Sequence, residues 1–297
     1  MNDYVILTDA AADHAETFLK RYSLFEIIPM EVTVNGKQYV YGGPQSEITC
    51  RTFYALQRGG CQTSTVLISP ETYIHYFSKY AEKKTDIIYI SFSSGLSGTF
   101  QSANLAACDV RASFPDVRIT CIDSLNAATA QGFLVHEALR EREAGLRYDE
   151  MVTWIESRRL NVGAYFAVDT MEYLVKGGRV SPAAASVGTA LHIRPVLTIN
   201  GLGKLQVLTR QRGMRKAMIS LVQKMSDAYV PEEGSYVLIC HADAPEPAEE
   251  LKNMVCEIFP DAEIEIGEID PVIGAHTGPG MISLVFWGKT RQTESAV

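Results

Sequence analysis

Residues 90–103 read Ile90-Ser91-Phe92-Ser93-Ser94-Gly95-Leu96-Ser97-Gly98-Thr99-Phe100-Gln101-Ser102-Ala103, and this stretch decides the fold. It continues an apolar run from Ile87 that is typical of a buried strand, and from Gln101 it can continue as a helix. Four serines, two glycines and a threonine lie between the predicted strand and the predicted helix. In such a loop, small hydroxyls and backbone N–H groups converge in front of a helix N-terminus, where an anion is held most easily. The stretch therefore predicts a site for a phosphate or a carboxylate.

The same residues are open to a plainer interpretation, a tight strand-to-helix turn in which a serine caps the helix. Two kinds of enzyme are disfavoured. The G-x-S-x-G nucleophile elbow is not matched, because Thr99 stands where its last glycine should be. The chain also contains no G-x-x-x-x-G-K-[ST] phosphate loop, which disfavours a Walker-type nucleotide enzyme.

The composition is that of a soluble globular protein. The chain has 297 residues, of which 46% are hydrophobic and 21% charged, and this length suits two domains. The net charge of −8 disfavours nucleic acid as a partner. One local basic cluster stands out against this charge, made of Arg210, Arg212, Arg215 and Lys216.

The six cysteines are widely dispersed and form no C-x-x-C pair, so we expect neither a metal site nor another cofactor. The first residues lack the features of a signal peptide, and no apolar run approaches the ~20 residues that span a bilayer. We therefore expect a cytoplasmic protein with reduced thiols.

Strand and helix signals alternate through residues 1–160, which predicts an α/β domain whose parallel sheet is covered by helices on both faces. A hairpin is expected at Asn35-Gly36, a helix start at Ser69-Pro70, and a helix capped by Asp149. Because ligands of parallel sheets bind at the carboxyl ends of strands, Asp9, residues 91–99 and Asp123-Ser124 should share one edge. For Asp9 and Asp123 we favour an architectural role over acid–base chemistry.

The regular alternation of strand and helix signals ends near residue 160. Residues 161–297 predict an α+β domain with a mixed or antiparallel sheet, including a hairpin around Asn200-Gly201. Gly177-Gly178 reads as a helix C-cap, and we favour a tie between the domains over an anion clamp for Arg179. The tail from Thr290 is expected to fray.

Taken together, the chain resembles the DegV family of bacterial fatty-acid-binding proteins over nearly its whole length. Six segments in family order carry the resemblance: Thr8-Asp9, Thr63-Ser64, residues 93–99 (SSGLSGT), Asp123-Ser124, residues 169–181 (DTMEYLVKGGRVS) and residues 274–280 (GAHTGPG). The resemblance implies two domains with a single long-chain fatty acid between them. It also implies a carrier without a catalytic group, which presents the acyl carboxylate to a separate fatty-acid kinase for acyl-phosphate formation and phospholipid synthesis.

The resemblance also implies the residues of the site. The family's carboxylate contacts match Thr63 and Ser97, and His276 matches the histidine that joins their polar network. Arg212, with Arg210 as the second choice, matches an arginine tied to the kinase encounter. The full candidate set for ligand binding adds the neighbours in both loops, Ser64, Ser93, Ser94, Gly95 and Gly98. Of these, Ser93 and Ser94 serve equally well as residues that only shape the loop.

Two departures from the family pattern concern the site. Ala10 replaces the serine usual after Thr-Asp, and Thr63-Ser64 continues as Thr65-Val66 where Gln-Pro is common. Both changes bear on the loop geometry and on the choice of acyl chain.

Two other functions stay open. One is a serine-dependent hydrolase of acyl or phosphate esters built on Ser97, His276 and Asp9, and the other is a lipid-sensing regulatory protein. No transmembrane segment is expected, and transient contact with a membrane surface is compatible with a lipid carrier.

Overall fold

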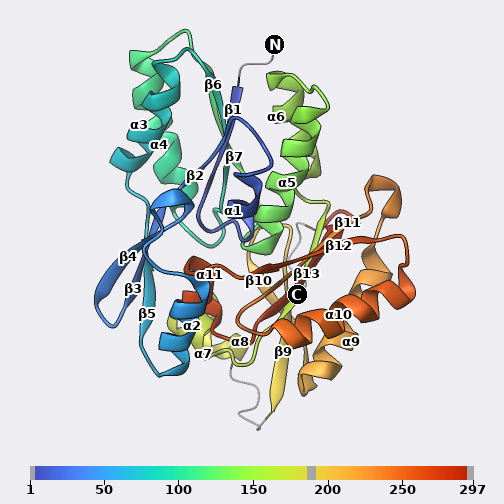
Figure 1. The fold of residues 1–297 in the computed structure, drawn as a ribbon. Helices are drawn as coiled ribbons and strands as arrows, with labels where there is room; N and C mark the ends of the chain where they lie inside the picture. The colour runs from blue at the N-terminus through green and yellow to red at the C-terminus, as the bar shows by residue number, and fades with distance from the viewer. Residues whose placement is uncertain (1–3, 186–191, 293–297) are drawn as a thin grey trace.

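The computed structural model describes residues 4–185 and 192–292. Its first layer is a parallel sheet of four strands in the order β2-β1-β6-β7 (Figure 1). These strands are β1 (Tyr4–Asp9), β2 (Phe25–Ile28), β6 (Asp86–Ser91) and β7 (Ile119–Asp123). Strands β1 and β6 are almost entirely buried, as expected for a parallel sheet with both faces covered.

Helices cover both faces of this parallel sheet (Figure 1). One pair, α3 (Pro70–Ala81) and α4 (Thr99–Ser113), lies on one side, and α5 (Thr129–Glu143) with α6 (Tyr148–Arg158) lies on the other. The short helix α1 (Ala15–Phe18) follows β1. Ser69 caps α3 as predicted, because its side chain accepts the backbone N–H of Thr72. The predicted α/β layer is confirmed.

The predicted cap of α6 is wrong. Its N-cap is Arg147, whose backbone N–H donates to the Glu150 side chain at 2.9 Å. Asp149 lies in the first turn, where it pairs with Arg118 at 3.1 Å. Glu150, three residues after the N-cap, takes the capping role because its carboxylate can reach back to the backbone N–H of Arg147 at the helix start.

A second sheet has three antiparallel strands in the order β4-β3-β5. The hairpin predicted at Asn35-Gly36 joins β3 (Met30–Val34) to β4 (Lys37–Tyr41), and β5 (Thr63–Val66) pairs with the other edge of β3. The helix α2 (Cys50–Arg58) lies between β4 and β5 in the chain. Sequence reading took Thr63-Ser64 as part of a loop, whereas the chain is a strand there.

The third sheet is mixed, as predicted, with six strands in the order β10-β9-β8-β13-β11-β12. Only β11 and β12 run parallel, and the other neighbours are antiparallel. Its strands are β8 (Val162–Ala167), β9 (Ile193–Ile199), β10 (Leu205–Arg212), β11 (Tyr236–His241), β12 (Glu263–Glu268) and β13 (Ile282–Trp287).

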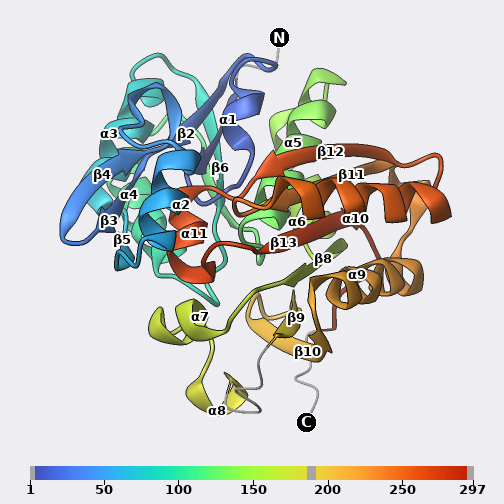
Figure 2. The ribbon, with the colours of Figure 1, turned by 60° about the horizontal axis from the view of Figure 1, so that its bottom comes forward.

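Helices α9 (Met214–Ala228) and α10 (Pro245–Ile258) pack together on the outer face of the mixed sheet (Figure 2). The remaining helices α7 (Glu172–Lys176), α8 (Pro182–Ala185) and α11 (Pro271–Thr277) are short. The predicted C-cap at Gly177-Gly178 is confirmed, because Gly177 caps α7 and Gly178 has a φ of +73°.

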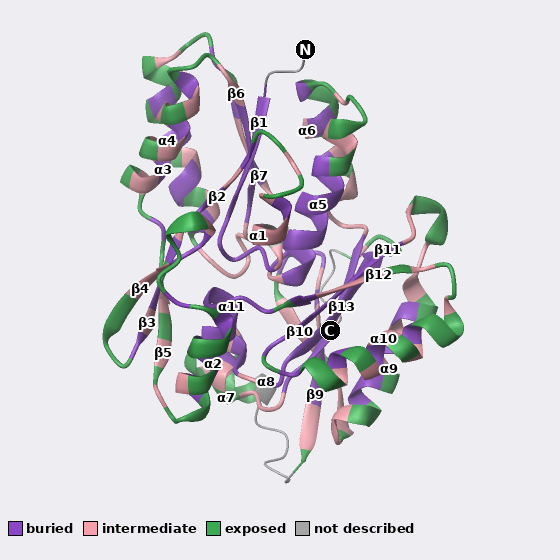
Figure 3. Ribbon diagram, in the orientation of Figure 1, coloured by how far each residue is buried: buried purple, intermediate pink, exposed green. Residues whose placement is uncertain are grey.

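Helix α5 joins the two halves of the molecule. It contacts β6 of the parallel sheet and β8, β11 and β13 of the mixed sheet. Every residue from Thr129 to Leu139 is buried, which Figure 3 shows as a continuous purple stretch. One hydrophobic core runs from Tyr4 to Trp287 through both halves of the chain. The boundary at residue 160 stays a prediction.

The frayed tail predicted from Thr290 is wrong for Arg291. Its guanidinium donates to the carbonyls of Leu125 and Arg159 at 3.0 and 2.8 Å, and it also reaches those of Ile199 and Asn200. These bonds fasten the loop of the β9–β10 hairpin beside the loop that follows β7. Residues 293–297 lie outside the described residues.

Candidate functional site

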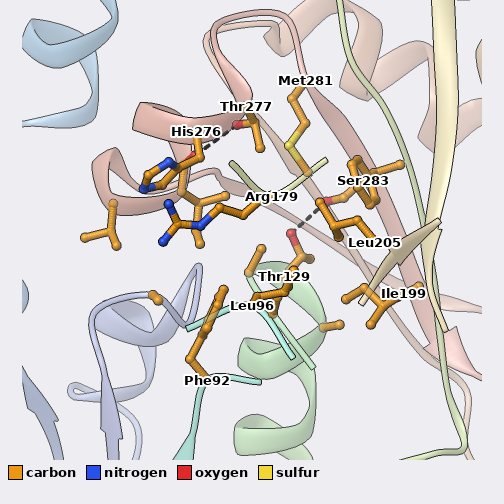
Figure 4. A pocket seen from close by; sticks show the side chains of 18 of the residues that line it. Phe92, Leu96, Thr129, Arg179, Ile199, Leu205, His276, Thr277, Met281 and Ser283 are labelled. Atoms are coloured by element: carbon orange, nitrogen blue, oxygen red, sulfur yellow. Dashed lines mark hydrogen bonds between the residues drawn. The ribbon is translucent and has the colours of Figure 1, made fainter. Parts of the chain in front are cut away.

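A cavity with an empty volume of about 820 Å³ lies where the parallel sheet, the three-stranded sheet and the mixed sheet meet (Figure 4). This volume includes space that opens to solvent. Most of its wall is apolar. The apolar lining consists of Ala11, Met30, Phe92, Leu96, Ala127, Ala128, Ala130, Ala164, Tyr165, Phe166, Leu174, Ile199, Leu205, Val272, Ile273, Met281 and Val285.

A cation faces this cavity without an acidic partner. Arg179, just after α7, is half-buried and its guanidinium donates to the carbonyl oxygen of Gly177. Within residues 4–185 and 192–292, no carboxylate charge acts on the pKa of this guanidinium. Burial lowers the pKa of the guanidinium from its ordinary value, but arginine stays charged at neutral pH. The cavity therefore offers one uncompensated positive charge in an apolar wall.

His276 of α11 lies beside Arg179 (Figure 4). Its Nε2 atom lies 2.8 Å from Oγ1 of Thr65, and both residues line the cavity. Burial, reinforced by the charge of Arg179, lowers the pKa of His276 to about 4. The imidazole is therefore neutral at physiological pH and has one N–H to donate and one nitrogen to accept.

Hydroxyl groups complete the polar part of the wall. Ser97 and Thr99 both line the cavity at the start of α4, and their side-chain oxygens lie 2.7 Å apart. The backbone N–H of Thr99 donates to Ser97 Oγ at 3.3 Å. With Arg179, His276 and Thr65, these groups can supply several hydrogen bonds to one anionic head group.

Of the predicted ligand-binding residues, the structure places Ser97 and His276 in the cavity wall. The others do not line it. Thr63 is turned to α11, where its hydroxyl donates to the carbonyl of Ala275 at 3.2 Å, and Ser64 is exposed. The residue of β5 that faces the cavity is Thr65, two positions after Thr63 on the same side of the strand.

The remaining predicted residues shape the serine-rich loop. The Ser93 hydroxyl donates to the carbonyl of Gly203 at 2.8 Å, and the Ser94 N–H donates to Asp123 Oδ1 at 3.1 Å. Gly95 packs so closely on the same hairpin loop that a Cβ there would lie 2.7 Å from the carbonyl oxygen of Leu202. Gly98 is the exposed N-cap of α4.

Sequence reasoning missed Thr65 and did not place Arg179 in the cavity wall. The alternation of exposed and half-buried residues along a strand would have put Thr65 on the face of Thr63, had residues 63–66 been read as a strand. Arg179 was expected to tie the domains together. Its place in the cavity depends on the fold around α7, which the capping glycines do not reveal.

Asp9 and Asp123 have the architectural roles that we favoured. Asp9 is fully buried and accepts hydrogen bonds from the Tyr89 hydroxyl at 2.6 Å and from the backbone N–H groups of Ala11 and Phe92. Asp123 accepts from the backbone N–H groups of Ser94 and Leu125. Both carboxylates hold the loops at the strand ends.

The hydrolase alternative needs Ser97, His276 and Asp9 in one hydrogen-bonded chain. In the structure, His276 is bonded to Thr65, Ser97 to Thr99, and Asp9 to the groups named above. The three residues therefore do not form a triad.

The basic residues Arg210 and Arg212 lie away from the cavity wall. Both belong to β10, the edge strand of the mixed sheet, and Arg212 is exposed. Across residues 4–185 and 192–292, no three His, Cys, Asp or Glu side chains are grouped to hold a metal ion. The same residues include no helix that is long and apolar enough to cross a bilayer.

Solved structures of known proteins share this fold. A DegV lipid-binding protein from Thermotoga maritima is 28% identical, with a TM-score of 0.82, 98% of this chain covered and 100% of that chain. A second T. maritima protein, whose structure is described as revealing fatty acid binding function, is also 28% identical, with a TM-score of 0.82 and coverage of 96% and 99%. The fatty acid kinase (Fak) B3 protein of Streptococcus pneumoniae, solved loaded with linoleic acid, has a TM-score of 0.85 at 22% identity and coverage of 96% and 99%.

Sequence comparison gives the family. A DegV domain-containing protein of Clostridium perfringens is 32% identical over 292 residues, which cover 98% of this chain and 100% of the relative. The sequence model of the DegV family, described as a family of uncharacterised proteins, matches residues 3–289. The chain belongs to the DegV family, as its sequence motifs predicted.

Proposed function

We propose that this protein binds one long-chain fatty acid in the cavity and carries it to a separate fatty-acid kinase in the cytoplasm. The observation that carries the proposal is the Arg179 guanidinium in a largely apolar cavity, where no carboxylate of the described residues acts on it. A ligand that complements such a cavity has one negative charge and a long apolar body. A fatty acid has both.

The two parts of the ligand contribute differently. Each buried methylene of the acyl chain contributes roughly 0.8 kcal/mol, so the chain supplies most of the affinity. The carboxylate is costly to bury unless donors satisfy it, and we assign this task to Arg179, His276, Thr65 and Ser97. In this proposal, Thr65 has the role in carboxylate binding that the family resemblance implied for Thr63. The head-group donors therefore fix which way the acid lies.

Known relatives support this ligand class. The two T. maritima proteins are described as lipid-binding and as fatty-acid-binding, and a DegV protein of Thermus thermophilus at 26% identity is described by its fatty acid binding. The S. pneumoniae protein is named for a fatty acid kinase system, which supports a kinase as the partner. In our proposal the phosphoryl transfer belongs to that kinase, and the carrier itself contributes no catalytic group.

The test is mass spectrometry of the purified protein, first native and then after denaturation and solvent extraction. We expect one fatty acid per chain, whose mass gives the acyl length and unsaturation. If the purified protein contains no fatty acid and takes up none that is added, the proposal is wrong, and another anionic ligand for Arg179 is favoured.

The kinase encounter gives a separate prediction. Arg212 is exposed on the edge strand β10 and does not line the cavity, and a cation there can attract an acidic partner surface. Arg212→Ala should therefore retain fatty acid like the wild type and be phosphorylated about ten-fold more slowly by the partner kinase, since ten-fold corresponds to about 1.4 kcal/mol. The measurement is the initial rate of acyl-phosphate formation at several salt concentrations. An unchanged rate at low salt would remove Arg212 from the docking surface.

A further inference from the structure

The C-terminal end of α11 is held by side chains from outside the helix. The last carbonyls of a helix have no partner within it and need one from elsewhere. The carbonyl of Gly274 accepts the Gly278 N–H at 2.9 Å and also the side-chain Nε2 of Gln57 at 2.9 Å. The carbonyl of Ala275 accepts the Thr63 hydroxyl at 3.2 Å. Gly274 and Ala275 are the two residues before His276.

Gln57 and Thr63 act as one unit. Nε2 of Gln57 also donates to Thr63 Oγ1 at 3.1 Å, so one amide group joins α2, β5 and α11. Gln57 is only 2% exposed, and among the described residues its Oε1 atom has no hydrogen-bond partner. Burying an unpaired amide oxygen is unfavourable. An apolar side chain of similar size would avoid this cost, so the two bonds made by Nε2 are the distinctive contribution of this residue.

The imidazole of His276 has little room to move. Thr65 contacts its Nε2 atom at 2.8 Å, and on the other side a Cβ added to Gly177 would lie 2.5 Å from its Nδ1 atom. The ring is thus confined between β5 and the end of α7. Its position then depends on the backbone that carries it, which is the segment that Gln57 and Thr63 hold.

We infer that Gln57 and Thr63 are positioning residues for His276: they hold residues 274–276 so that the imidazole stays half-buried and bonded to Thr65 in the cavity wall. The inference deepens the proposed function and rests on it only where it concerns the fatty acid. It also gives Thr63 a role behind the site in place of direct contact with the ligand.

The physical consequence is a measurable pKa. The pKa of His276 is lowered to about 4 by burial and by Arg179, which is the charged neighbour that acts on it. If the two carbonyls lose their side-chain donors, the last turn of α11 loosens and the half-buried ring becomes more exposed to water. Hydration favours the charged imidazolium, so the pKa should rise toward its ordinary value of 6.5.

The experiment measures the pKa of His276 by NMR of the imidazole nitrogens in protein freed of lipid. The variants are Thr63→Val, which removes the hydroxyl at constant shape, and Gln57→Met, which removes the amide at similar length. The resonance is assigned with His276→Asn. The matched control is Thr120→Val on β7, because that threonine is also half-buried and hydrogen-bonded to another element, at 2.6 Å from the Tyr148 hydroxyl.

We expect the pKa of His276 to rise by about one unit or more in Thr63→Val and Gln57→Met and to stay unchanged in the control. A folded Thr63→Val protein with a wild-type His276 titration would overturn the inference, whether or not Gln57→Met folds. Because the titration needs no fatty acid, it is decided independently of the proposed function, which fails if wild-type protein takes up no fatty acid. Retention of a fatty acid at pH 7 should fall in the same two variants.

Discussion

Replacing Arg179 with methionine should weaken fatty-acid binding at neutral pH by about 30- to 150-fold. Methionine keeps much of the length and apolar surface of arginine but removes the charge. In the proposed complex, the carboxylate would then lie in an apolar wall with hydroxyls and a neutral imidazole as its polar neighbours. Losing one partner of a desolvated charge pair costs about 2–3 kcal/mol or more, and each 1.4 kcal/mol is a factor of ten in Kd.

The measurement is displacement of a fluorescent fatty acid, with Arg179→Lys as the variant that keeps the charge. Arg194→Met is the matched control, because Arg194 is also half-buried but pairs with Asp169 at 2.9 Å and does not line the cavity. We expect Arg179→Lys to recover part of the affinity and Arg194→Met to bind like the wild type. If Arg179→Met binds within two-fold of the wild type, the head group lies elsewhere in the cavity.

The second large effect concerns a buried acid behind the cavity wall. Asp13 is fully buried, and its carboxylate accepts the backbone N–H of Asp270 and the hydroxyl of Thr129, each at 3.0 Å. Asp270 is the N-cap of α11, and Thr129 begins α5 and lines the cavity. Burial raises the pKa of Asp13 from 3.8 to about 7, and burial together with the charge of Asp13 also raises the pKa of Asp270.

The sign of the pH dependence follows from the raised pKa of Asp13. The folded protein holds the proton more tightly than the unfolded chain, so the stabilisation is complete below about pH 4 and is lost as the pH rises to about 7. The loss grows with the difference between the folded and unfolded pKa values. Stability should therefore fall as the pH is raised from 4 to 7.

Asp13→Asn should remove this loss. The asparagine oxygen can accept the Asp270 N–H, and its amide nitrogen can donate to Thr129, as the protonated acid would. We expect the variant to be more stable than the wild type at pH 8 by a few kcal/mol and to have a flatter pH profile. Urea unfolding at pH 5, 6, 7 and 8 measures this, with the exposed Asp149→Asn as control. A variant that is destabilised equally at every pH would contradict the expectation.

The sequence by itself determined the parallel sheet with its helices and the mixed sheet, because these depend on local patterns. The apolar run from Ile87 to Ile90, the Asn35-Gly36 turn and the Ser69-Pro70 helix start all predict their elements, since periodicity, turn geometry and capping act over a few residues. The same local reasoning gave the serine-rich loop at a strand end, and Ser97, which the family resemblance singled out in this loop, lies in the cavity wall.

Only the tertiary structure decided which polar side chains share the cavity. Thr65 and His276 are 211 residues apart in the chain, and their contact depends on how α11 packs on β5. Thr63 faces the same way along β5, yet the end of α11 covers it and takes its hydroxyl. The position of Arg179 depends in the same way on the packing of α7. Contacts between distant segments are set by the shape of the assembled core, which no local pattern encodes.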